Sequence, residues 1–313
     1  MANIVVTAGI SPSWLTPLSG HQVILPAPKT GMKPEELAHY LPEAEAIIAI
    51  GPLNGDQIRM AKKARIIANY GAGYDKVDIQ AAAEMGIPVT NLTDSTAEAT
   101  AELAFGLMLD VTRRISETNL RFRQEPSRPM FGMGASTGRT LRGQTLGLIG
   151  VGYIGKCMAR MAKAFGMHVI GYSRRGADPA VCTPVSLEEL LATSDVVSLH
   201  CPLTPETENL MSRERIFSMK QGAILINTAR GPVVNNQALA EAVAQGHLRG
   251  AGLDVFPHEP EIPAAYLPLP TVVMTPHIGT DAADIRQEMA HVCCSQVLDA
   301  LQGKRPAHIV NGL

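Results

Sequence analysis

The sequence contains few cysteines, no long apolar run and no long run of one charge, and each absence excludes a class of protein. Its five cysteines are an odd number, and the adjacent pair Cys293 and Cys294 fits neither a disulfide framework nor metal-ligand spacing. No apolar run approaches the roughly 18 residues of a membrane span, and no basic segment precedes the short apolar start MANIVVTAG. We therefore expect no metal, no membrane insertion and a reducing, cytoplasmic setting.

The balance of charge argues against a macromolecular partner. The formal net charge is -2, and basic residues form no long run. Nucleic acid or an acidic membrane surface would require a basic footprint that this sequence lacks. A chain of 313 residues, 46% of them hydrophobic, is long enough for two domains with substantial cores. We expect the partner to be a small molecule.

Short apolar runs rich in β-branched residues alternate with helical patterns from the N-terminus onward. Strands are predicted at 3–9, 21–25, 46–50, 65–71 and 87–91, with helices at 33–41, 55–64 and 78–86 among them. Strands that are buried on both faces read as continuous apolar runs, as these do. The pattern therefore predicts an α/β fold with a parallel sheet.

A longer helical segment, 94–117, interrupts this rhythm, and the stretch 126–138 that follows it is rich in Pro, Gly and Ser. We expect the chain to cross between domains there. The alternation then resumes with six predicted strands, at 145–150, 167–172, 195–200, 223–227, 251–256 and 271–277. Six strands suffice for a complete doubly wound dinucleotide domain.

The motif GVGYIG lies between the first of these strands and a predicted helix at 156–166. Its glycines, Gly150, Gly152 and Gly155, suit a tight turn, a close approach of backbone to a pyrophosphate and a helix N-terminus that offers amide donors. A glycine-rich helix start can also serve packing alone. The strand before the motif and the helix after it favour a dinucleotide site.

About 20 residues after such a glycine motif, a dinucleotide-binding chain usually places an acidic residue against the adenosine ribose. The stretch VIGYSRRG offers Ser173, Arg174 and Arg175 instead. A carboxylate would repel a 2′-phosphate, whereas Ser can donate a hydrogen bond to it and Arg can pair with it. The stretch predicts a preference for NADP(H), with NAD(H) possible. The alternative is that both arginines are solvated loop residues and that Ser173 merely tolerates NAD(H).

Three chemically competent residues follow strand ends in the same half of the chain: Arg230, Glu259 and His277. Ligands of an open α/β sheet bind beyond the carboxyl ends of its strands. Each residue alone has an ordinary interpretation, as a surface ion pair, a solvated carboxylate or a capping histidine. Together they supply what reduction of a 2-oxo acid requires of a protein, namely a proton donor and a fixed cation for the carboxylate and carbonyl.

The chain resembles the D-isomer-specific 2-hydroxyacid dehydrogenase family over nearly its whole length. The resemblance rests on NYGAGYDKVD, TAEATAEL, GLIGVGYIG, HCPLTPET, INTARGPVV, GLDVF and TPHIG, in the family's order. Within the family, the GAGYD loop, the TAEATAEL helix and the YSRR stretch are similar to the glyoxylate/hydroxypyruvate reductase branch. The resemblance implies an α/β fold of two doubly wound parallel-sheet domains. A Rossmann-type dinucleotide domain, 98–282, is inserted into a flavodoxin-like substrate domain, 1–97 and 283–313.

The resemblance also implies roles for individual residues. His277 gives the proton in reduction, Glu259 orients the imidazole and favours its protonated form, and Arg230 binds the carboxylate and carbonyl oxygens of the substrate. The backbone of Gly71, Ala72 and Gly73 is expected to offer amides to the same carboxylate in an interdomain cleft. Leu53 is a candidate pocket wall, with a plain loop contact as the alternative.

For the cofactor, the resemblance implies contacts from each part of the nucleotide domain. The expected residues are Gly150, Gly152, Tyr153, Ile154 and Gly155 at the pyrophosphate, Ser173, Arg174 and Arg175 at the adenosine ribose, Cys201 and Pro202 at the adenine, and Thr228, Ala229 and Asp254 at the nicotinamide. We therefore expect an oxidoreductase that transfers a hydride between NADP(H) and a small 2-oxo or D-2-hydroxy acid.

Two alternatives for the function stay open. Phosphoglycerate dehydrogenase, or another NAD-dependent D-2-hydroxyacid dehydrogenase, is the enzymatic runner-up. A dinucleotide-sensing corepressor is the alternative of another class and predicts tight cofactor binding without turnover.

A homodimer is expected through the apolar helix 100–114 and the segment 121–138, which carries Phe122, Met130, Phe131 and Met133. The alternative for that segment is an intramolecular lid.

Overall fold

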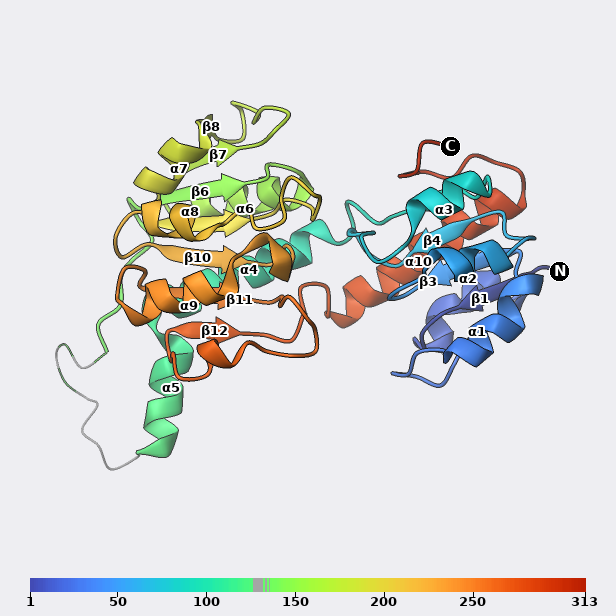
Figure 1. Cartoon of the computed structure of the whole chain (residues 1–313), viewed down its shortest axis with the longest axis horizontal. Helices are drawn as coiled ribbons and strands as arrows, with labels where there is room; N and C mark the ends of the chain where they lie inside the picture. The colour runs from blue at the N-terminus through green and yellow to red at the C-terminus, as the bar shows by residue number, and fades with distance from the viewer. Residues whose placement is uncertain (126–131, 133, 135) are drawn as a thin grey trace. The chain divides into compact units, whose positions relative to one another are not determined.

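The computed structural model describes residues 1–125, 132, 134 and 136–313 and divides into two compact units (Figure 1). The first unit comprises Met1–Thr96 and Thr280–Leu313, and the second comprises Ala97–Gly279. Both contain a parallel sheet covered by helices, so the predicted fold class is confirmed. That the first unit binds the substrate stays a prediction.

The first unit has a five-stranded sheet in the order β2-β1-β3-β4-β5, which is the flavodoxin-like order. Its strands are β1 (Asn3–Val6), β2 (Gln22–Ile24), β3 (Ala46–Ala49), β4 (Ile67–Asn69) and β5 (Val89–Thr90). Its helices are η1 (Pro12–Leu18), α1 (Pro34–Tyr40), η2 (Leu41–Glu43), α2 (Gly55–Met60), α3 (Ile79–Glu84) and α10 (Ala283–Leu301). All its strand pairs are parallel, and each sheet face has its own apolar core.

Helix α10 brings the C-terminal part of the chain back to the first unit. Its buried side chains pack with η1 and with Ile4, Ile48 and Ala68 of the sheet. The adjacent cysteines, Cys293 and Cys294, are free thiols in this core, and burial raises the pKa of Cys294 to about 11. They therefore pack as small apolar side chains of this core.

The second unit has a seven-stranded parallel sheet in the order β12-β11-β10-β9-β6-β7-β8. Its strands are β6 (Thr145–Ile149), β7 (His168–Tyr172), β8 (Thr183–Pro184), β9 (Val196–Leu199), β10 (Ile224–Asn227), β11 (Gly250–Leu253) and β12 (Val272–Met274). The prediction of six strands missed β8, because two exposed edge residues, one of them a proline, carry no strand pattern. Strand β6 pairs with both β7 and β9, so the direction of strand order reverses there.

Helices cover both faces of this second sheet (Figure 1). They are α4 (Ala97–Arg113), α5 (Ile115–Gln124), α6 (Tyr153–Ala164), α7 (Leu187–Thr193), α8 (Arg213–Ser218), η3 (Gly231–Val233), α9 (Asn236–Ala244) and η4 (Ala264–Tyr266). Side chains of α4 and α6 form one core with the sheet, and those of α7, α8 and α9 form the other. Among the helices of the described residues, none combines the length and apolarity needed to cross a membrane.

The single helix predicted over 94–117 is wrong, because the chain breaks it at Arg114. This residue has a φ of 58°, a left-handed conformation that ends α4 before α5 begins. Its guanidinium donates to both oxygens of Glu117, at 2.7 and 2.6 Å, and Arg121 lies 2.7 Å from the same carboxylate. Periodicity alone does not predict such a break, since apolar spacing continues through it.

Helix α5 exposes apolar side chains where a surface helix is normally polar. Ile115, Leu120 and Phe122 are 55%, 50% and 44% exposed. Of the apolar residues predicted to mediate a dimer, Met130, Phe131 and Met133 lie outside the described residues. The dimer contact stays a prediction.

The ion pairs of Glu117 generate a prediction about stability. The Glu117 side chain is 3% exposed, and its hydrogen bonds from Arg114 hold the pKa of this carboxyl below its usual value. A depressed pKa in the folded state gives stability that is present above the unfolded pKa and is lost as pH falls through the folded one. We expect Glu117→Gln to lower the free energy of unfolding by about 1–3 kcal/mol near neutral pH.

Urea unfolding of wild type and variant over a range of pH measures this difference. It should shrink as pH falls through the usual carboxyl range and below it, because the unfolded chain then binds a proton at Glu117 before the folded protein does. Glu102→Gln, at an exposed position of α4, is the control and should have little effect at any pH. A Glu117→Gln effect that is the same at pH 3 and pH 7 would contradict the account.

Candidate active site

The glycine motif forms the turn from β6 into α6. Gly150 has a φ of 95°, and a Cβ there would lie 2.6 Å from the carbonyl carbon and oxygen of His200. A Cβ on Gly155 would lie 2.3 Å from the carbonyl oxygen of Gly150, whereas one on Gly152 would meet nothing within 4 Å. Packing thus requires Gly150 and Gly155. Gly152 is the N-cap residue of α6, where the absence of a side chain lets a phosphate approach the helix amides.

A pocket of about 410 Å³ opens at this edge of the sheet, beyond β6, β7 and β9. Of the predicted cofactor residues, it is lined by Gly150, Gly152, Ser173, Arg174, Arg175, Cys201 and Pro202. Tyr153 and Ile154 begin α6 next to it, and the Tyr153 side chain is exposed. The lining also includes residues that the sequence did not single out: Thr204, Glu206 and Thr207. The pocket lies at the switch in strand order, where dinucleotide-binding sheets hold their ligand.

The SRRG stretch forms a tight turn after β7. The amide of Gly176 donates to the carbonyl of Ser173 at 2.9 Å, and Gly176 has a φ of 86°. Arg174 and Arg175 are therefore the central residues of the turn, and both are exposed. A guanidinium of this turn, that of Arg174, lies 3.5 Å from the Glu206 carboxylate.

Thr228, at the end of β10, also fits a bound dinucleotide. Its residue is 7% exposed, and its hydroxyl is buried without a hydrogen-bond partner within the described part of the chain. Buried hydroxyls are normally satisfied, so this hydroxyl at a strand end has a donor and acceptor capacity that a ligand would satisfy. Together with the open approach at Gly152, it fits a nicotinamide dinucleotide lying along the ends of β6 and β10.

Asn227 shapes the loop that carries Arg230. It is 1% exposed at the end of β10, and its side-chain amide donates to the carbonyl of Arg230 at 3.0 Å while accepting from the amide of Ala229 at 3.0 Å. The Arg230 guanidinium donates to the carbonyl of Ala229 at 2.7 Å. One buried side chain therefore closes the turn on which the predicted substrate cation stands.

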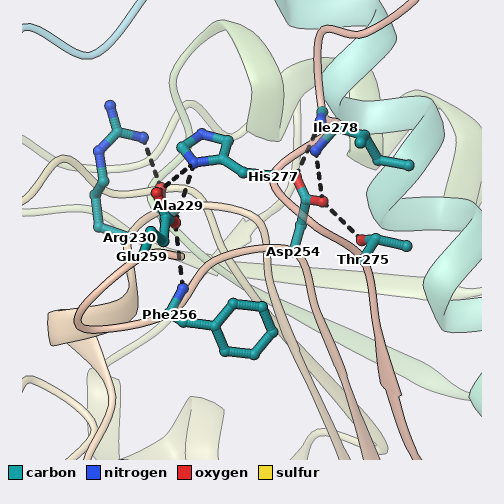
Figure 2. Close-up of polar contacts among 9 residues, drawn as sticks. Ala229, Arg230, Asp254, Phe256, Glu259, Thr275, His277 and Ile278 are labelled. Atoms are coloured by element: carbon teal, nitrogen blue, oxygen red, sulfur yellow. Dashed lines mark hydrogen bonds and ion pairs between the residues drawn. The ribbon is translucent and has the colours of Figure 1, made fainter. Parts of the chain in front are cut away.

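The imidazole of His277 lies against the Glu259 carboxylate. Its Nδ1 is 2.9 and 3.0 Å from the two carboxylate oxygens, and Figure 2 shows Arg230 extending in the same part of the site. Glu259 also accepts from the amide of Phe256 at 3.3 Å. The side chains of His277 and Glu259 are 41% and 24% exposed. With Nδ1 held by the carboxylate, Nε2 is the nitrogen left to face a substrate.

Asp254 holds the turn that carries His277. Its buried carboxylate accepts from the Thr275 hydroxyl at 2.6 Å and from the amides of Ile278 and Gly279 at 2.8 and 2.9 Å (Figure 2). The amide of His277, whose φ is 55°, donates to the Asp254 carbonyl. Burial raises the pKa of Asp254, and these three donors offset only part of that effect. The carboxylate of Asp254 thus serves this turn. Its predicted contact with nicotinamide stays a prediction.

In the first unit, two asparagines fix the loop of Gly71, Ala72 and Gly73. The Asn69 amide donates to the carbonyls of Gly71 and Gly73, and the Asn91 amide donates to that of Ala72. The amide of Gly71 donates to the Asn69 carbonyl at 2.9 Å, and its expected contact with a substrate carboxylate stays a prediction. Contacts from Ala72 and Gly73 stay predictions.

Leu53 is fully buried in the core of the first unit. Its amide and carbonyl bond to Lys76 and Asp78, and it lies in a cluster that includes Val77. The position matches the plain loop contact that was the alternative for this residue, and its role as a pocket wall stays a prediction.

Comparison with known proteins decides the family. The model of the D-isomer specific 2-hydroxyacid dehydrogenase NAD-binding domain matches residues 105–279. The chain belongs to this family. It is 38% identical over 282 residues to a glyoxylate reductase of Thermococcus litoralis, covering 86% of this chain and 84% of the relative.

Two further relatives bear on the alternatives. A D-3-phosphoglycerate dehydrogenase of Methanocaldococcus jannaschii is 35% identical over 90% of this chain, which spans only 54% of that protein. The solved structure of an NADPH-dependent glyoxylate/hydroxypyruvate reductase of Sinorhizobium meliloti, in complex with NADP and malonate, is 28% identical with a TM-score of 0.88. That likeness covers 99% of this chain and 96% of the other. The chain is therefore an oxidoreductase that acts on the CH–OH group of 2-hydroxy acids with a nicotinamide dinucleotide.

The Asn227 clamp generates a prediction about catalysis. Asn227→Ala removes both bonds that fix the Arg230 loop, so the guanidinium loses its set position. We expect kcat/KM for the 2-oxo acid to fall about 10- to 100-fold, since displacement of a positioning group by about 1 Å has effects of that size. Steady-state kinetics at saturating cofactor measure the change.

Asn235→Ala is the matched control for this prediction. Asn235 caps α9 by accepting from the amide of Ala238 at 3.0 Å, so its loss lowers stability by about 1 kcal/mol without touching the Arg230 turn. Its kcat/KM should stay near that of the wild type. Equal losses of kcat/KM in the two variants would show that Asn227 matters only for folding.

Proposed function

We propose that this protein reduces small 2-oxo acids of the glyoxylate and hydroxypyruvate type to 2-hydroxy acids, of the D configuration where the product is chiral, with NADP(H) as the preferred cofactor. The observation that carries the proposal is the His277–Glu259 pair, which lies beyond the same sheet edge as Arg230 in a chain of this family. The similarity to a glyoxylate reductase supports the substrate class.

In reduction, the bound dinucleotide supplies the hydride. His277 donates a proton from Nε2 to the carbonyl oxygen, because Nδ1 is held by Glu259. Glu259 holds the ring in the orientation that leaves Nε2 for the substrate. Arg230 binds the substrate carboxylate and polarises the carbonyl, for which its planar guanidinium offers two donors in one plane. In oxidation, the same histidine accepts the proton.

Two observations support the preference for NADP(H). The turn after β7 carries no carboxylate and presents Arg174 and Arg175 at a pocket that Ser173 also lines. A solved relative that binds NADP is described as NADPH-dependent. The carboxylate that would repel a 2′-phosphate is therefore absent from the turn where the adenosine ribose is expected.

The proposal extends to assembly. We propose a homodimer formed through the second unit, since α5 exposes three large apolar side chains, Ile115, Leu120 and Phe122. Burial of this face against its symmetry mate would remove these side chains from water.

Phosphoglycerate dehydrogenase activity is the second candidate, favoured by the relative from Methanocaldococcus jannaschii. A screen of glyoxylate, hydroxypyruvate and 3-phosphohydroxypyruvate with NADPH separates the two, with the absorbance of reduced nicotinamide as the readout. Turnover of the first two, with the D isomer of glycerate formed from hydroxypyruvate, supports the proposal. Turnover of the phosphorylated acid alone would favour the second candidate, and binding of NADPH without turnover of any acid would favour a corepressor.

In the same assay, His277→Ala should lower kcat by about 10²- to 10⁴-fold with cofactor affinity kept, because it removes the proton donor and no cofactor contact. His168→Ala, at an exposed position where β7 begins, is the control and should keep its kcat. Near-normal turnover by His277→Ala across the pH range would sink the assignment of the proton donor.

The recognition of the 2′-phosphate yields a further prediction. Arg174→Ala should lower kcat/KM for NADPH by a factor that corresponds to a loss of about 1.5–3 kcal/mol in binding free energy. The change should appear mainly in KM, because the phosphate is remote from the hydride. NADH, which has no phosphate to lose, should be little affected. Adding Ser173→Asp should reverse the preference, since the new carboxylate repels the phosphate and accepts from ribose hydroxyls.

Arg142→Ala serves as the control, because Arg142 is an exposed arginine outside the pocket lining. It should leave both cofactors unaffected. A double variant Ser173→Asp, Arg174→Ala that keeps the wild-type preference for NADPH would show that these residues form only a basic loop.

A further inference from the structure

The adenosine side of the cofactor pocket contains a carboxylate on the loop that follows β9. Glu206 lines the pocket together with Ser173 and Arg174 of the turn after β7. Strands β7 and β9 pair with opposite edges of β6, so the two loops reach the pocket from the two sides of the glycine turn. The turn after β7 has no acidic residue, but the loop after β9 places one, Glu206, in the same pocket.

Glu206 is the one carboxylate among the lining residues, all of which belong to the described part of the chain. The other titratable groups there are two arginines, a histidine, a cysteine and a tyrosine. Burial lowers the pKa of His200 to about 4 and raises that of Cys201 to about 11, so both are neutral at physiological pH. The charge of the pocket is therefore set by Arg174, Arg175 and Glu206.

The geometry fixes Glu206 toward Arg174. Its Oε2 accepts from the Thr204 hydroxyl at 2.7 Å and lies 3.5 Å from an Arg174 Nη1. The loop itself is tied by Thr207, whose hydroxyl donates to the Pro202 carbonyl at 2.6 Å. The hydrogen bond from Thr204 holds the pKa of Glu206 below its usual value, so the carboxylate is charged at neutral pH.

We propose that Glu206 is a specificity-determining residue, which lowers the preference for NADP(H) by competing with the 2′-phosphate for Arg174. The inference rests on the proposed recognition of that phosphate by Ser173 and Arg174. The Arg174 and Glu206 side chains are 68% and 64% exposed, so water screens their attraction and a phosphate can displace the carboxylate. Glu206 therefore moderates the preference without abolishing it.

The test is Glu206→Gln, which keeps the shape of the side chain and removes its charge. We expect kcat/KM for NADPH to rise about 2- to 10-fold through a lower KM. The Arg174 guanidinium would no longer pair with a carboxylate, and the negative charge of Glu206 would no longer repel the 2′-phosphate. The value for NADH should change less than about twofold, because NADH carries no phosphate at this position. Glu208→Gln is the matched control, on the same loop and exposed but outside the lining, and should change neither cofactor.

The Arg174→Ala background separates this inference from the proposed function. If Glu206 acts through Arg174, the gain from Glu206→Gln should largely disappear in the double variant. If Arg174→Ala weakens NADPH but Glu206→Gln leaves it unchanged, or if Glu208→Gln gives the same gain, the role of Glu206 is wrong and recognition of the phosphate stands. If Arg174→Ala does not weaken NADPH, the proposed recognition fails and this inference fails with it.

Discussion

The site depends on the way the carboxyl ends of β10, β11 and β12 are tied together. Asn227 closes the turn after β10, and its carbonyl accepts from the amide of Asp254 at the end of β11. The Asp254 carboxylate in turn holds the turn after β12 through Thr275, Ile278 and Gly279. Side-chain positions within a few tenths of an ångström are what catalysis requires, and two buried polar residues supply that constraint here.

The same constraint explains the division of roles between buried and exposed groups. Asn227 and Asp254 are each 1% exposed and bond only to backbone and a hydroxyl in the contacts described above, whereas His277 remains 41% exposed. The buried pair thus sets geometry, and the imidazole stays accessible, as its proposed role as proton donor requires. The cofactor pocket at β6 uses a different principle. There the glycines leave space at the turn, and we propose that the exposed charges in the lining adjust which dinucleotide is favoured.

Much of the fold could be predicted from the sequence, because parallel strands buried on both faces are continuous apolar runs. Ile4, Ile48 and Leu148 are examples, because each of these residues is fully buried within a strand of such a run. What the sequence could not predict was local. Arg114 adopts a left-handed conformation that helical periodicity does not signal, and β8 is too short to carry a pattern.

For the site, spacing and strand ends indicated Arg230, Glu259 and His277, but they did not indicate Asn227, which closes the Arg230 turn, or Glu206, which lies beside Arg174. Asn227 reads in sequence as the last residue of a strand, and Glu206 as one acid of a polar loop. Their roles follow from partners that are distant in space or hidden from solvent, which composition and spacing do not reveal. A buried asparagine at a strand end was the one available signal, since a buried polar side chain requires partners.

The central claim is that these strand ends hold Arg230 and His277 for reaction with one 2-oxo acid. A crystal structure of the complex with NADP and the unreactive substrate analogue oxamate tests it most directly. The account predicts that the Arg230 guanidinium donates to the oxamate carboxylate and that Nε2 of His277 lies within hydrogen-bonding distance of its carbonyl oxygen. It also predicts that the Asn227 and Asp254 bonds are unchanged. Oxamate bound with His277 turned away from the carbonyl, or with its carboxylate held by groups other than Arg230, would contradict the account.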